Sequence, residues 1–407
     1  MHVAACSRKN PSTPGASSRL PGSCRARVCA VLLCTGILSD PSALAQTTTP
    51  GRQNSFTVSP HAGFSEPLIE ALLYNPPQEQ YRWKELDAKE PVTLTIGPRL
   101  VLLGRGFADG VCRLAYQIEG AGKPLHAGAA EVKVAHGVFE LEEALSRRLP
   151  EATHVSYELT GGQPPAVRGR SELRWSRFHG QVKYLDGGWR STYAQLRPNG
   201  FLSSVLFYVP ISDDGRFDAQ LPARIYSVIN VNGAGYSRDA MERWAWDYDL
   251  TRDREELFTI GRTELYSIHA FNIVGGPSTI FVAFRPTALT RILHFDADGD
   301  GRISAQERKA MEAALMQSPT AIGPELRPEN VTVWMNGVPQ KIAQFNQIPE
   351  YDGEFWQVQY ILQFLPEPRP VVPGVWHEIK LEVRSKESLR GREMVDFGQG
   401  SVGFCKK

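Results

Sequence analysis

Three aspartates at alternating positions form the part of the sequence with the clearest metal-binding chemistry. Asp296, Asp298 and Asp300 are followed by Gly301, and Glu307 ends the segment. Ca²⁺ is a hard ion that takes about six to eight oxygen ligands, and carboxylates are common donors. Glycine lets the chain reverse through a positive φ, and a final glutamate can offer both carboxylate oxygens. The spacing therefore predicts a calcium-binding loop.

These residues resemble the twelve-position loop of the EF-hand, which matches here from Asp296 to Glu307. Arg302 would contribute its backbone carbonyl, and Ser304 would bind directly or through a water. The predicted calcium ligands are Asp296, Asp298, Asp300, Arg302, Ser304 and Glu307. The alternative is an acidic, glycine-containing turn that binds no ion.

Helices are predicted on both sides of this loop. Ser304 can cap a helix that runs to Gln317, and Glu307 three residues later completes a capping box. Before the loop, Thr287 to Phe295 carries apolar residues at helical spacing and predicts about two turns. Sensor EF-hands work in pairs, whereas this sequence has a single such loop. We therefore predict that Ca²⁺ orders the join between the second and third β regions as a structural clamp.

The first 45 residues read as a secretory signal peptide. Basic residues precede the first acidic one, an apolar run follows from Val28 to Leu38, and Ala43-Leu44-Ala45 is a small-residue cleavage pattern. The apolar run is too short to span a bilayer, and the mature chain is predicted to have no transmembrane segment. An exported, periplasmic or extracellular protein is the expectation, with a buried N-terminal helix as the alternative. Export would permit a disulfide between Cys112 and Cys405, and their pairing stays open.

The whole chain has 407 residues, of which 42% are hydrophobic and 22% charged. This is enough to bury cores in about two to four domains. The formal net charge is +1 without a basic stripe, so nucleic acid is not expected as a partner. From residue 92 onward, alternating apolar runs between Gly, Pro and Asp predict antiparallel strands. The predicted fold is mainly β, with two to three Ig-like or transthyretin-like sandwiches and one EF-hand insertion.

The predicted domain boundaries follow these composition changes. Residues 66–73 predict a short helix inside an otherwise polar extension. The expected units are a signal peptide (1–45), a linker and N-terminal extension (46–91), a first sandwich (92–176), a second sandwich (177–286), the EF-hand (287–318) and a C-terminal sandwich (319–407).

An ordered series of turn and core residues lies between residues 178 and 230. It consists of Gly180, Val182, Asp186-Gly187, Ala194, Leu196, Asp214-Gly215, Phe217, Leu221-Pro222, Tyr226 and Val228. The series resembles the carboxypeptidase regulatory-like domain, a transthyretin-like β-sandwich, although Arg224 stands where that family usually has glycine. The resemblance implies a sandwich fold and a non-catalytic module, and it names no ligand.

An aromatic stripe is the second candidate site. Trp244, Trp246 and Tyr248 alternate with smaller or charged residues, so a regular strand would place them on one face. Such a face could be a sugar-stacking platform or part of a sandwich core, where each ring would bury a large area. Both interpretations stay open here.

No nucleophile elbow, P-loop or zinc-ligand spacing occurs in the sequence. The predicted function is an exported, calcium-binding, non-catalytic binding or scaffold protein, with carbohydrate or another cell-surface protein as a further partner. The alternatives are a carbohydrate-binding accessory protein that uses the aromatic stripe, and a glycan-active hydrolase whose carboxylates meet only in the fold.

Overall fold

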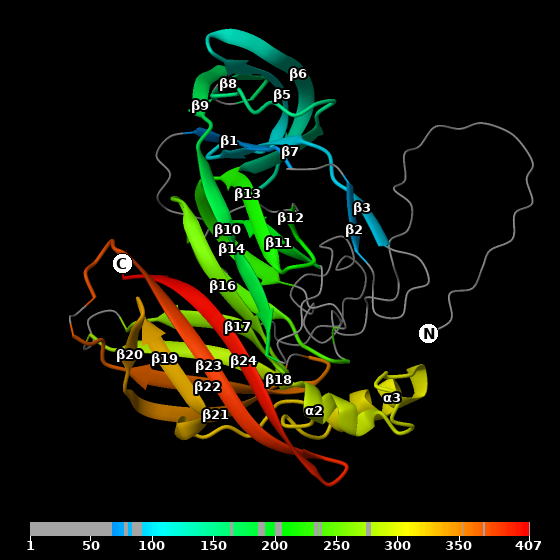
Figure 1. Ribbon diagram of the computed structural model, residues 1–407. Coiled ribbons are helices and arrows are strands. Elements are labelled where there is room, and N and C mark those ends of the chain that lie inside the picture. Colours follow the sequence, from blue (N-terminus) through cyan, green and yellow to red (C-terminus); the bar gives the residue numbers. More distant parts are fainter. Residues whose placement is uncertain are drawn as a thin grey trace, which may run out of the picture.

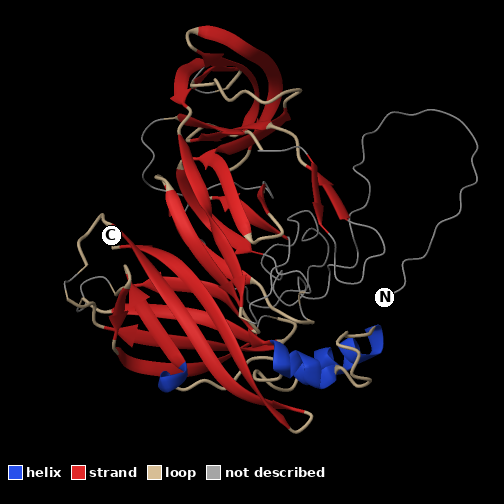
Figure 2. Ribbon diagram, in the orientation of Figure 1, coloured by secondary structure: helices blue, strands red, loops and turns tan. Residues whose placement is uncertain are grey.

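The fold is known from a computed structural model, and the prediction of a mainly β fold is confirmed (Figures 1 and 2). The predicted signal peptide lies outside the described residues. The structure describes residues 67–76, 80–83, 92–162, 166–185, 192–199, 206–231, 236, 238–273, 278–351, 353–368 and 371–406. None of the helices in these ranges is both long and apolar enough to cross a membrane.

The first sandwich packs a three-stranded sheet against a four-stranded one. The first sheet has the order β1-β4-β7, and the second has the order β6-β5-β8-β9. Their bounds are β1 (Leu68–Tyr74), β4 (Arg99–Arg105), β7 (Val138–Ala144), β5 (Gly110–Gly120), β6 (Lys123–Val134), β8 (His154–Thr160) and β9 (Ala166–Glu172). The polar side chains of β9 alternate with partly buried ones, as expected for the edge of a sheet with one covered face.

β1 corrects the prediction of a helix at residues 66–73, and it places part of the predicted N-terminal extension (46–91) in the first sandwich. Its side chains enter two different cores: Ile69, Ala71 and Leu73 face the first sandwich, whereas Leu72 and Tyr74 join the core of the second. A strand covered on both faces reads as a continuous apolar run. Periodicity alone cannot distinguish such a run from a buried helix.

The second sandwich also combines three strands with four. β13-β10-β16 form one sheet, and β12-β11-β14-β15 form one end of a larger sheet. β10 pairs with β16 in parallel and with β13 antiparallel. The bounds are β10 (Trp175–Tyr184), β11 (Thr192–Pro198), β12 (Phe207–Ile211), β13 (Arg216–Pro222), β14 (Arg224–Val231), β15 (Arg243–Leu250) and β16 (Arg254–Ile260). A separate two-stranded pair, β2 (Gln80–Trp83) and β3 (Val92–Thr95), precedes β4.

The third sandwich begins earlier in the chain than predicted. Two strands from the expected second block, β17 and β18, form one sheet with β22 and β21 in the order β17-β18-β22-β21 and line the third core. The opposing strands are β24-β23-β19-β20. The bounds are β17 (Thr263–Phe271), β18 (Ile280–Ala288), β19 (Val331–Met335), β20 (Val338–Gln340), β21 (Ile342–Tyr351), β22 (Trp356–Phe364), β23 (Trp376–Leu389) and β24 (Arg392–Cys405). The predicted boundary at residue 286 therefore cuts through this sandwich.

A short parallel contact joins the second and third sandwiches into one sheet of eight strands. β15 pairs with β24 only from Trp244, opposite Gly400, to Trp246, opposite Val402. Beyond this contact β15 continues beside β14, and β24 continues beside β23. Three residue pairs thus form the whole ladder between the two domains.

The helices form one insertion between β18 and β19, at one end of the third sandwich (Figure 2). The insertion holds α2 (Leu289–Ile292), η4 (Leu293–Phe295) and α3 (Ala305–Leu315), and η5 (Pro328–Asn330) follows it. A small core of its own holds Leu289, Ile292, Met311 and Leu315 together with Met241 of the β14–β15 connection. The helical motif therefore lies within the third sandwich and not between two sandwiches.

Candidate metal centre and the junction of the second and third sandwiches

The predicted calcium loop is closed by hydrogen bonds from its own backbone. Asp296 accepts two of them, from the N–H of Gly299 to Oδ1 at 2.7 Å and from the N–H of Gly301 to Oδ2 at 3.0 Å. Both glycines have positive φ, 81° and 78°. Asp298 accepts from Asp300 at 3.1 Å in the same manner. The aspartates are thus held toward the inside of a tight turn.

Three of the predicted ligand residues come together at the centre of this turn. One carboxylate oxygen from each of Asp296, Asp298 and Glu307 lies within 4.8 Å of the others. Asp300 lies outside this cluster and accepts a hydrogen bond from the N–H of Arg302 at 2.7 Å. Three carboxylates at such spacing can share one divalent cation. The remaining predicted ligands, Arg302 and Ser304, follow in the same loop.

Glu307 holds the beginning and the end of the loop together. Its Oε1 accepts from the N–H of Ala297 at 2.6 Å, and its Oε2 accepts from the N–H of Ser304 at 2.8 Å. The Ser304 hydroxyl in turn accepts from the N–H of Glu307, so the predicted capping box of α3 is confirmed. Hydrogen bonds from Ser304 and then Ala297 lower the pKa of Glu307. The entering helix is shorter than predicted, one α turn followed by η4.

Two arginines from distant segments lie against this loop. Arg390, in the turn between β23 and β24, donates to the Asp296 carbonyl and lies 3.4 Å from Asp296 Oδ2. A side chain at Gly299 would displace that guanidinium, and the positive φ of Gly299 is itself the stronger reason for glycine there. Arg238, from the connection between β14 and β15, lies next to Gly301. The loop therefore touches both the third sandwich and a segment of the second.

A buried carboxylate anchors the start of the helical insertion. Asp396 on β24 is fully buried and accepts from Arg262 Nε at 2.9 Å. It also accepts from the backbone N–H and the hydroxyl of Thr290, at 2.9 and 2.6 Å. Arg291 adds an ion pair with Glu387 at 3.0 Å. These contacts fix α2 to the β23–β24 hairpin, and hence the position of the loop that follows.

The aromatic stripe does not lie on one face, so that prediction is wrong. Trp244 and Trp246 stack with ring centroids 5.8 Å apart, and Tyr266 meets both edge-on. Tyr248 instead belongs to the core of the second sandwich. Asp247, which lies between Trp246 and Tyr248 in the sequence, has a φ of 46°, and this conformation breaks the alternation of the strand. Trp246 packs against the third core, so the stripe divides between two domains.

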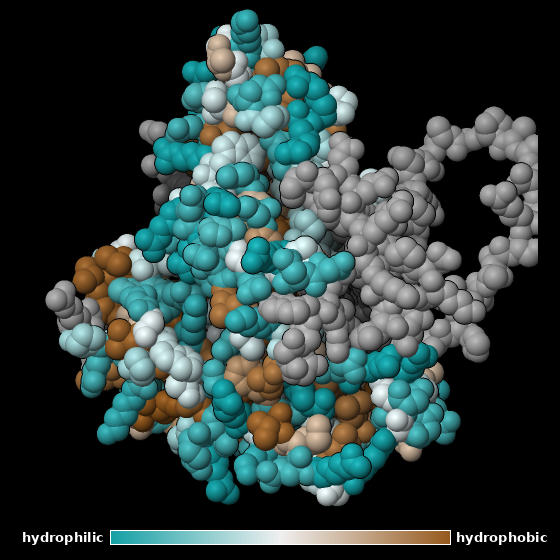
Figure 3. All heavy atoms as spheres, viewed as in Figure 1, coloured by the Kyte–Doolittle hydropathy of each residue, from teal (hydrophilic) through white to brown (hydrophobic). Residues whose placement is uncertain are grey.

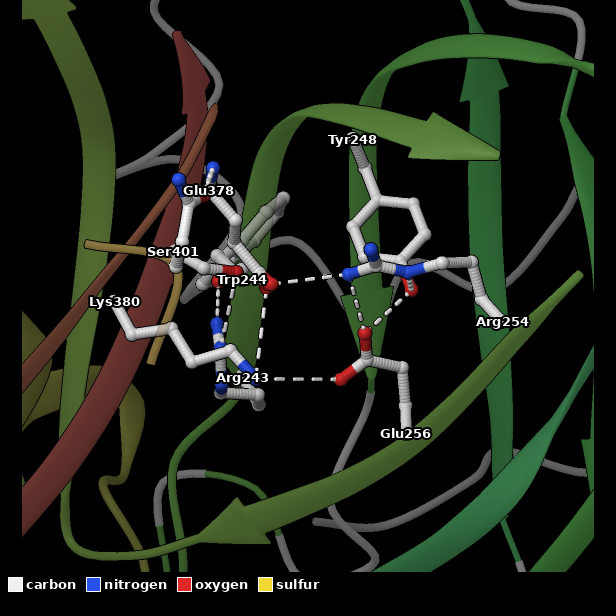
Figure 4. Close-up of polar contacts among 9 residues, drawn as sticks. Arg243, Trp244, Tyr248, Arg254, Glu256, Glu378, Lys380 and Ser401 are labelled. Carbon is white, nitrogen blue, oxygen red and sulfur yellow. Dashed lines mark hydrogen bonds and ion pairs between the residues drawn. The ribbon is translucent and has the colours of Figure 1, made fainter. Parts of the chain in front are cut away.

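A network of charged side chains spans the junction of these domains (Figure 4). Glu256 on β16 accepts from the Tyr248 hydroxyl at 2.7 Å and from Arg254 at 2.9 Å. Arg254 also donates to Glu378 on β23 at 3.0 Å, across 124 positions of sequence. Lys380 lies 3.7 Å from Glu256 and 3.5 Å from Glu378. Sequence analysis missed this network because no local spacing connects its members.

Arg243 brings a third positive charge into the same junction. Its side chain is only 4% exposed and donates to the Trp244 carbonyl and, at 3.1 Å, to the Ser401 hydroxyl. Burial lowers its pKa to about 10, and the nearby Glu256 and Glu378 oppose this shift. The guanidinium is charged at neutral pH. The two glutamates therefore neutralise most of the charge of three neighbouring cations, of which Arg243 is buried, Arg254 partly buried and Lys380 exposed to solvent.

A cavity of about 380 Å³ lies beside this network, next to the end of the β15–β24 pairing. Its lining includes the aromatic residues Trp246, Tyr248 and Trp376. Its polar lining residues are Asp247, Asp249, Arg252, Arg254, Asn336, His377, Glu378 and Ser401. Residues of both domains therefore line the cavity, and they include both acidic and basic side chains.

The protonation state of His377 follows from its neighbours. Asn336 Oδ1 accepts from the N–H of Glu378 at 2.9 Å, which turns the Asn336 amide nitrogen toward His377 Nδ1, also at 2.9 Å. Nδ1 must then accept, and Nε2 carries the hydrogen. Nε2 is buried and has no hydrogen-bond partner among the residues that the structure describes. Burial lowers the pKa of His377, so the ring is neutral.

Acid is expected to destabilise the protein partly through His377. The folded pKa lies below the ordinary value of 6.5, so the unfolded chain takes up the proton first as the pH falls. The stabilising contribution of neutral His377 is present above pH 6.5 and is lost as the pH falls toward the lowered pKa. Urea unfolding at pH 7.5 and 5.5 should show this loss, and His377→Gln should reduce it. His136→Asn, at an exposed position, should leave the loss unchanged; an unaltered loss in His377→Gln would contradict the assignment.

Both cysteines in the described residues are free thiols. Cys112 is buried in the core of the first sandwich, and Cys405 is partly exposed on β24 of the third. The two therefore belong to different domains and are not joined.

Comparisons with known proteins give weak likenesses to solved structures only. No family model and no curated protein matches this chain. A DUF3823 family protein from Parabacteroides merdae is similar at 11% identity, with 56% of this chain and 99% of that chain covered and a TM-score of 0.17. A DUF3823 family protein from Bacteroides ovatus is similar at 11% identity, with 57% of this chain and 100% of that chain covered and a TM-score of 0.18. The major pilin subunit BcpA of Bacillus cereus is similar at 7% identity, with 48% of this chain and 70% of that chain covered and a TM-score of 0.15.

Proposed function

We propose that the protein is an exported, calcium-binding, non-catalytic scaffold or binding protein, in which Ca²⁺ occupies the loop from Asp296 to Glu307. The observation that carries the proposal is the convergence of three carboxylates within 4.8 Å, directly before a capped helix. Asp300, the carbonyl of Arg302 and the side chain of Ser304 would complete the oxygen ligands. A single loop of this kind in an extracellular module binds calcium with a dissociation constant of about 10⁻⁴ to 10⁻³ M.

Calcium would act here as a clamp that holds the loop against the rest of the third sandwich and against a segment of the second. The loop contacts the tip of the β23–β24 hairpin through Arg390 and the β14–β15 connection through Arg238. The positive charge of Arg390, close to Asp296, offsets part of the repulsion between the carboxylates and would also weaken the attraction for the ion. This arrangement supports a modest affinity and a stabilising role.

Export and the absence of catalysis are supported by the sequence. The first 45 residues have the charge and apolar pattern of a secretory signal, and millimolar calcium is available outside cells. The resemblance of residues 178–230 to a carboxypeptidase regulatory-like domain supports a non-catalytic module. We therefore propose a scaffold or binding role rather than an enzymatic one.

Calorimetric titration with Ca²⁺ tests this function. We expect binding heat at millimolar calcium, and stabilisation of about 1.4 kcal/mol when free calcium is ten times the dissociation constant. Asp296→Asn combined with Glu307→Gln should abolish both effects, because the substitutions remove two of the converging carboxylates. Terbium luminescence, excited through nearby aromatic residues, gives a second readout of the same site.

The matched control is Asp214→Asn, which changes another acidic turn that also ends in glycine. Asp214 is exposed and bonds to Ser212 and Arg216 within its own hairpin. This variant should bind calcium as the unmodified protein does. Equal unfolding midpoints in calcium and in chelator, together with no binding heat, would refute the proposal.

A further inference from the structure

We propose that the cavity at the junction of the second and third sandwiches binds a short saccharide. The inference concerns residues other than the calcium loop and does not depend on calcium binding. The cavity lies at the end of the short pairing between β15 and β24, and residues 246–249 of β15 and 401–403 of β24 line it. Its volume of about 380 Å³ lies in the range of small-molecule sites.

The aromatic lining offers surfaces for the C–H faces of sugar rings. Trp376 and Tyr248 line the cavity from the third and second sandwiches, and Trp246 lies at their junction. Gly403 lets Trp376 approach the sheet closely, because a Cβ there would collide with the indole ring. Val375 belongs to a group of exposed apolar residues between β22 and β23 that also includes Leu365 and Val372. Figure 3 shows apolar residues on the visible face of the third sandwich.

The polar lining offers both donors and acceptors. Arg254 and Glu378 bind each other at 3.0 Å through Glu378 Oε2, whereas Glu378 Oε1 is buried without a hydrogen-bond partner in the described residues and lies 3.5 Å from Lys380 Nζ. Asp247 and Asp249 present carboxylates, although one oxygen of Asp249 already accepts from Thr251. Arg252 is exposed and can donate. The cavity is therefore equipped to bond with groups that can both give and accept hydrogens.

His377 and Trp246 add donors that the protein leaves without acceptors. Nε2–H of His377 and the indole N–H of Trp246 are buried and have no hydrogen-bond partner in the described part of the chain. Such orphan donors are costly, and because both atoms expose almost no surface, a ligand oxygen would satisfy them only after a small shift of the side chains around the cavity. Both belong to residues that line the cavity.

Hydroxyl groups match this lining better than other chemistries do. Each hydroxyl has one donor hydrogen and two acceptor lone pairs, so it can serve Asp249 and Arg252 alike. A phosphate would be repelled by the carboxylates of Asp247, Asp249 and Glu378. An alkylammonium ion would be repelled by Arg252, and it has no lone pair with which to accept from the two orphan donors. A purely apolar ligand would leave the charged groups desolvated.

Titration with defined probes tests the saccharide site. The probes are cellotriose, chitotriose and maltotriose, with spermidine and inorganic phosphate as the competing chemistries. We expect at least one trisaccharide to bind with a dissociation constant of millimolar order or tighter and to change the fluorescence of Trp246 and Trp376. Binding should persist in chelator, which separates this site from the calcium loop. Trp376→Ala and Asp249→Asn should each weaken it at least tenfold.

The control is Tyr351→Ala, an aromatic residue that is 52% exposed on β21, outside the cavity. This variant should bind the trisaccharide normally. Unfolding midpoints will show whether Trp376→Ala folds, and the rim variant Arg252→Ala supplies an independent measurement if it does not. If none of the three trisaccharides binds, or if only spermidine or phosphate binds, the proposal is overturned.

Discussion

Replacing Glu256 by alanine is expected to lower the free energy of unfolding by about 3–5 kcal/mol, the usual cost of removing one member of a buried ion pair. Glu256 is 6% exposed and accepts from Tyr248 and Arg254. Its loss would leave Glu378 alone to balance the charges of Arg254, Lys380 and the buried Arg243. Glu256→Gln should cost less, because the amide oxygen can still accept a hydrogen bond.

Urea unfolding followed by tryptophan fluorescence measures this effect. The neighbouring Glu255 provides the control, since it is exposed on the same strand and Glu255→Ala should change stability by less than about 0.5 kcal/mol. Equal unfolding midpoints for the two alanine variants would show that the network contributes nothing to stability. Because Glu378 and Lys380 belong to β23, we also expect Glu256→Ala to weaken the contact between the second and third sandwiches.

The second large effect is expected for Asp396→Ala, again about 3–5 kcal/mol. Asp396 is fully buried, and its carboxylate holds Arg262 as well as two donors of Thr290. Alanine would leave the partly buried guanidinium of Arg262 without its counter-charge and would release the start of α2. The helical insertion should then detach locally, before the rest of the third sandwich unfolds.

Limited trypsin digestion distinguishes this local effect from general destabilisation. We expect Asp396→Ala to be cleaved faster at Arg291 and Arg308 of the insertion, under conditions where the sandwiches stay intact. Glu393→Ala is the matched control, because Glu393 lies on the same strand but is 65% exposed and pairs only with Lys386. Identical cleavage rates in the two variants would show that Asp396 does not anchor α2.

Features that depend on neighbouring residues could be predicted from the sequence. The alternation from Trp356 to Phe364 is β22, and Asn336-Gly337 forms a tight hairpin turn with φ angles of 50° and 80°. The capping box of α3 is present because Ser304 and Glu307 lie within one helical turn. In each case the determining contact joins residues only a few positions apart.

Features that depend on long-range pairing could not be predicted. The sequence of β1 resembles a helix because its two faces meet two cores, which removes the alternation of a half-buried strand. The aromatic stripe departs from its predicted single face because Asp247 adopts a left-handed conformation, which no local sequence pattern indicates. The cavity and its charged network combine β15 and β16 with β23 and β24, and this closeness exists only in the folded chain.

The interior position of β24 sets an order of assembly during synthesis. β24 leaves the ribosome after every other described strand, yet it lies between β15 and β23 in the eight-stranded sheet. Until it arrives, β15 and β23 both present open backbone edges, which are templates for pairing with strands of other molecules. The first two domains can close early, whereas the third has to wait for its last strand, which also joins it to the second. If translation paused just before residue 392, both strand edges would stay open, and the chain would be most prone to aggregation at that stage.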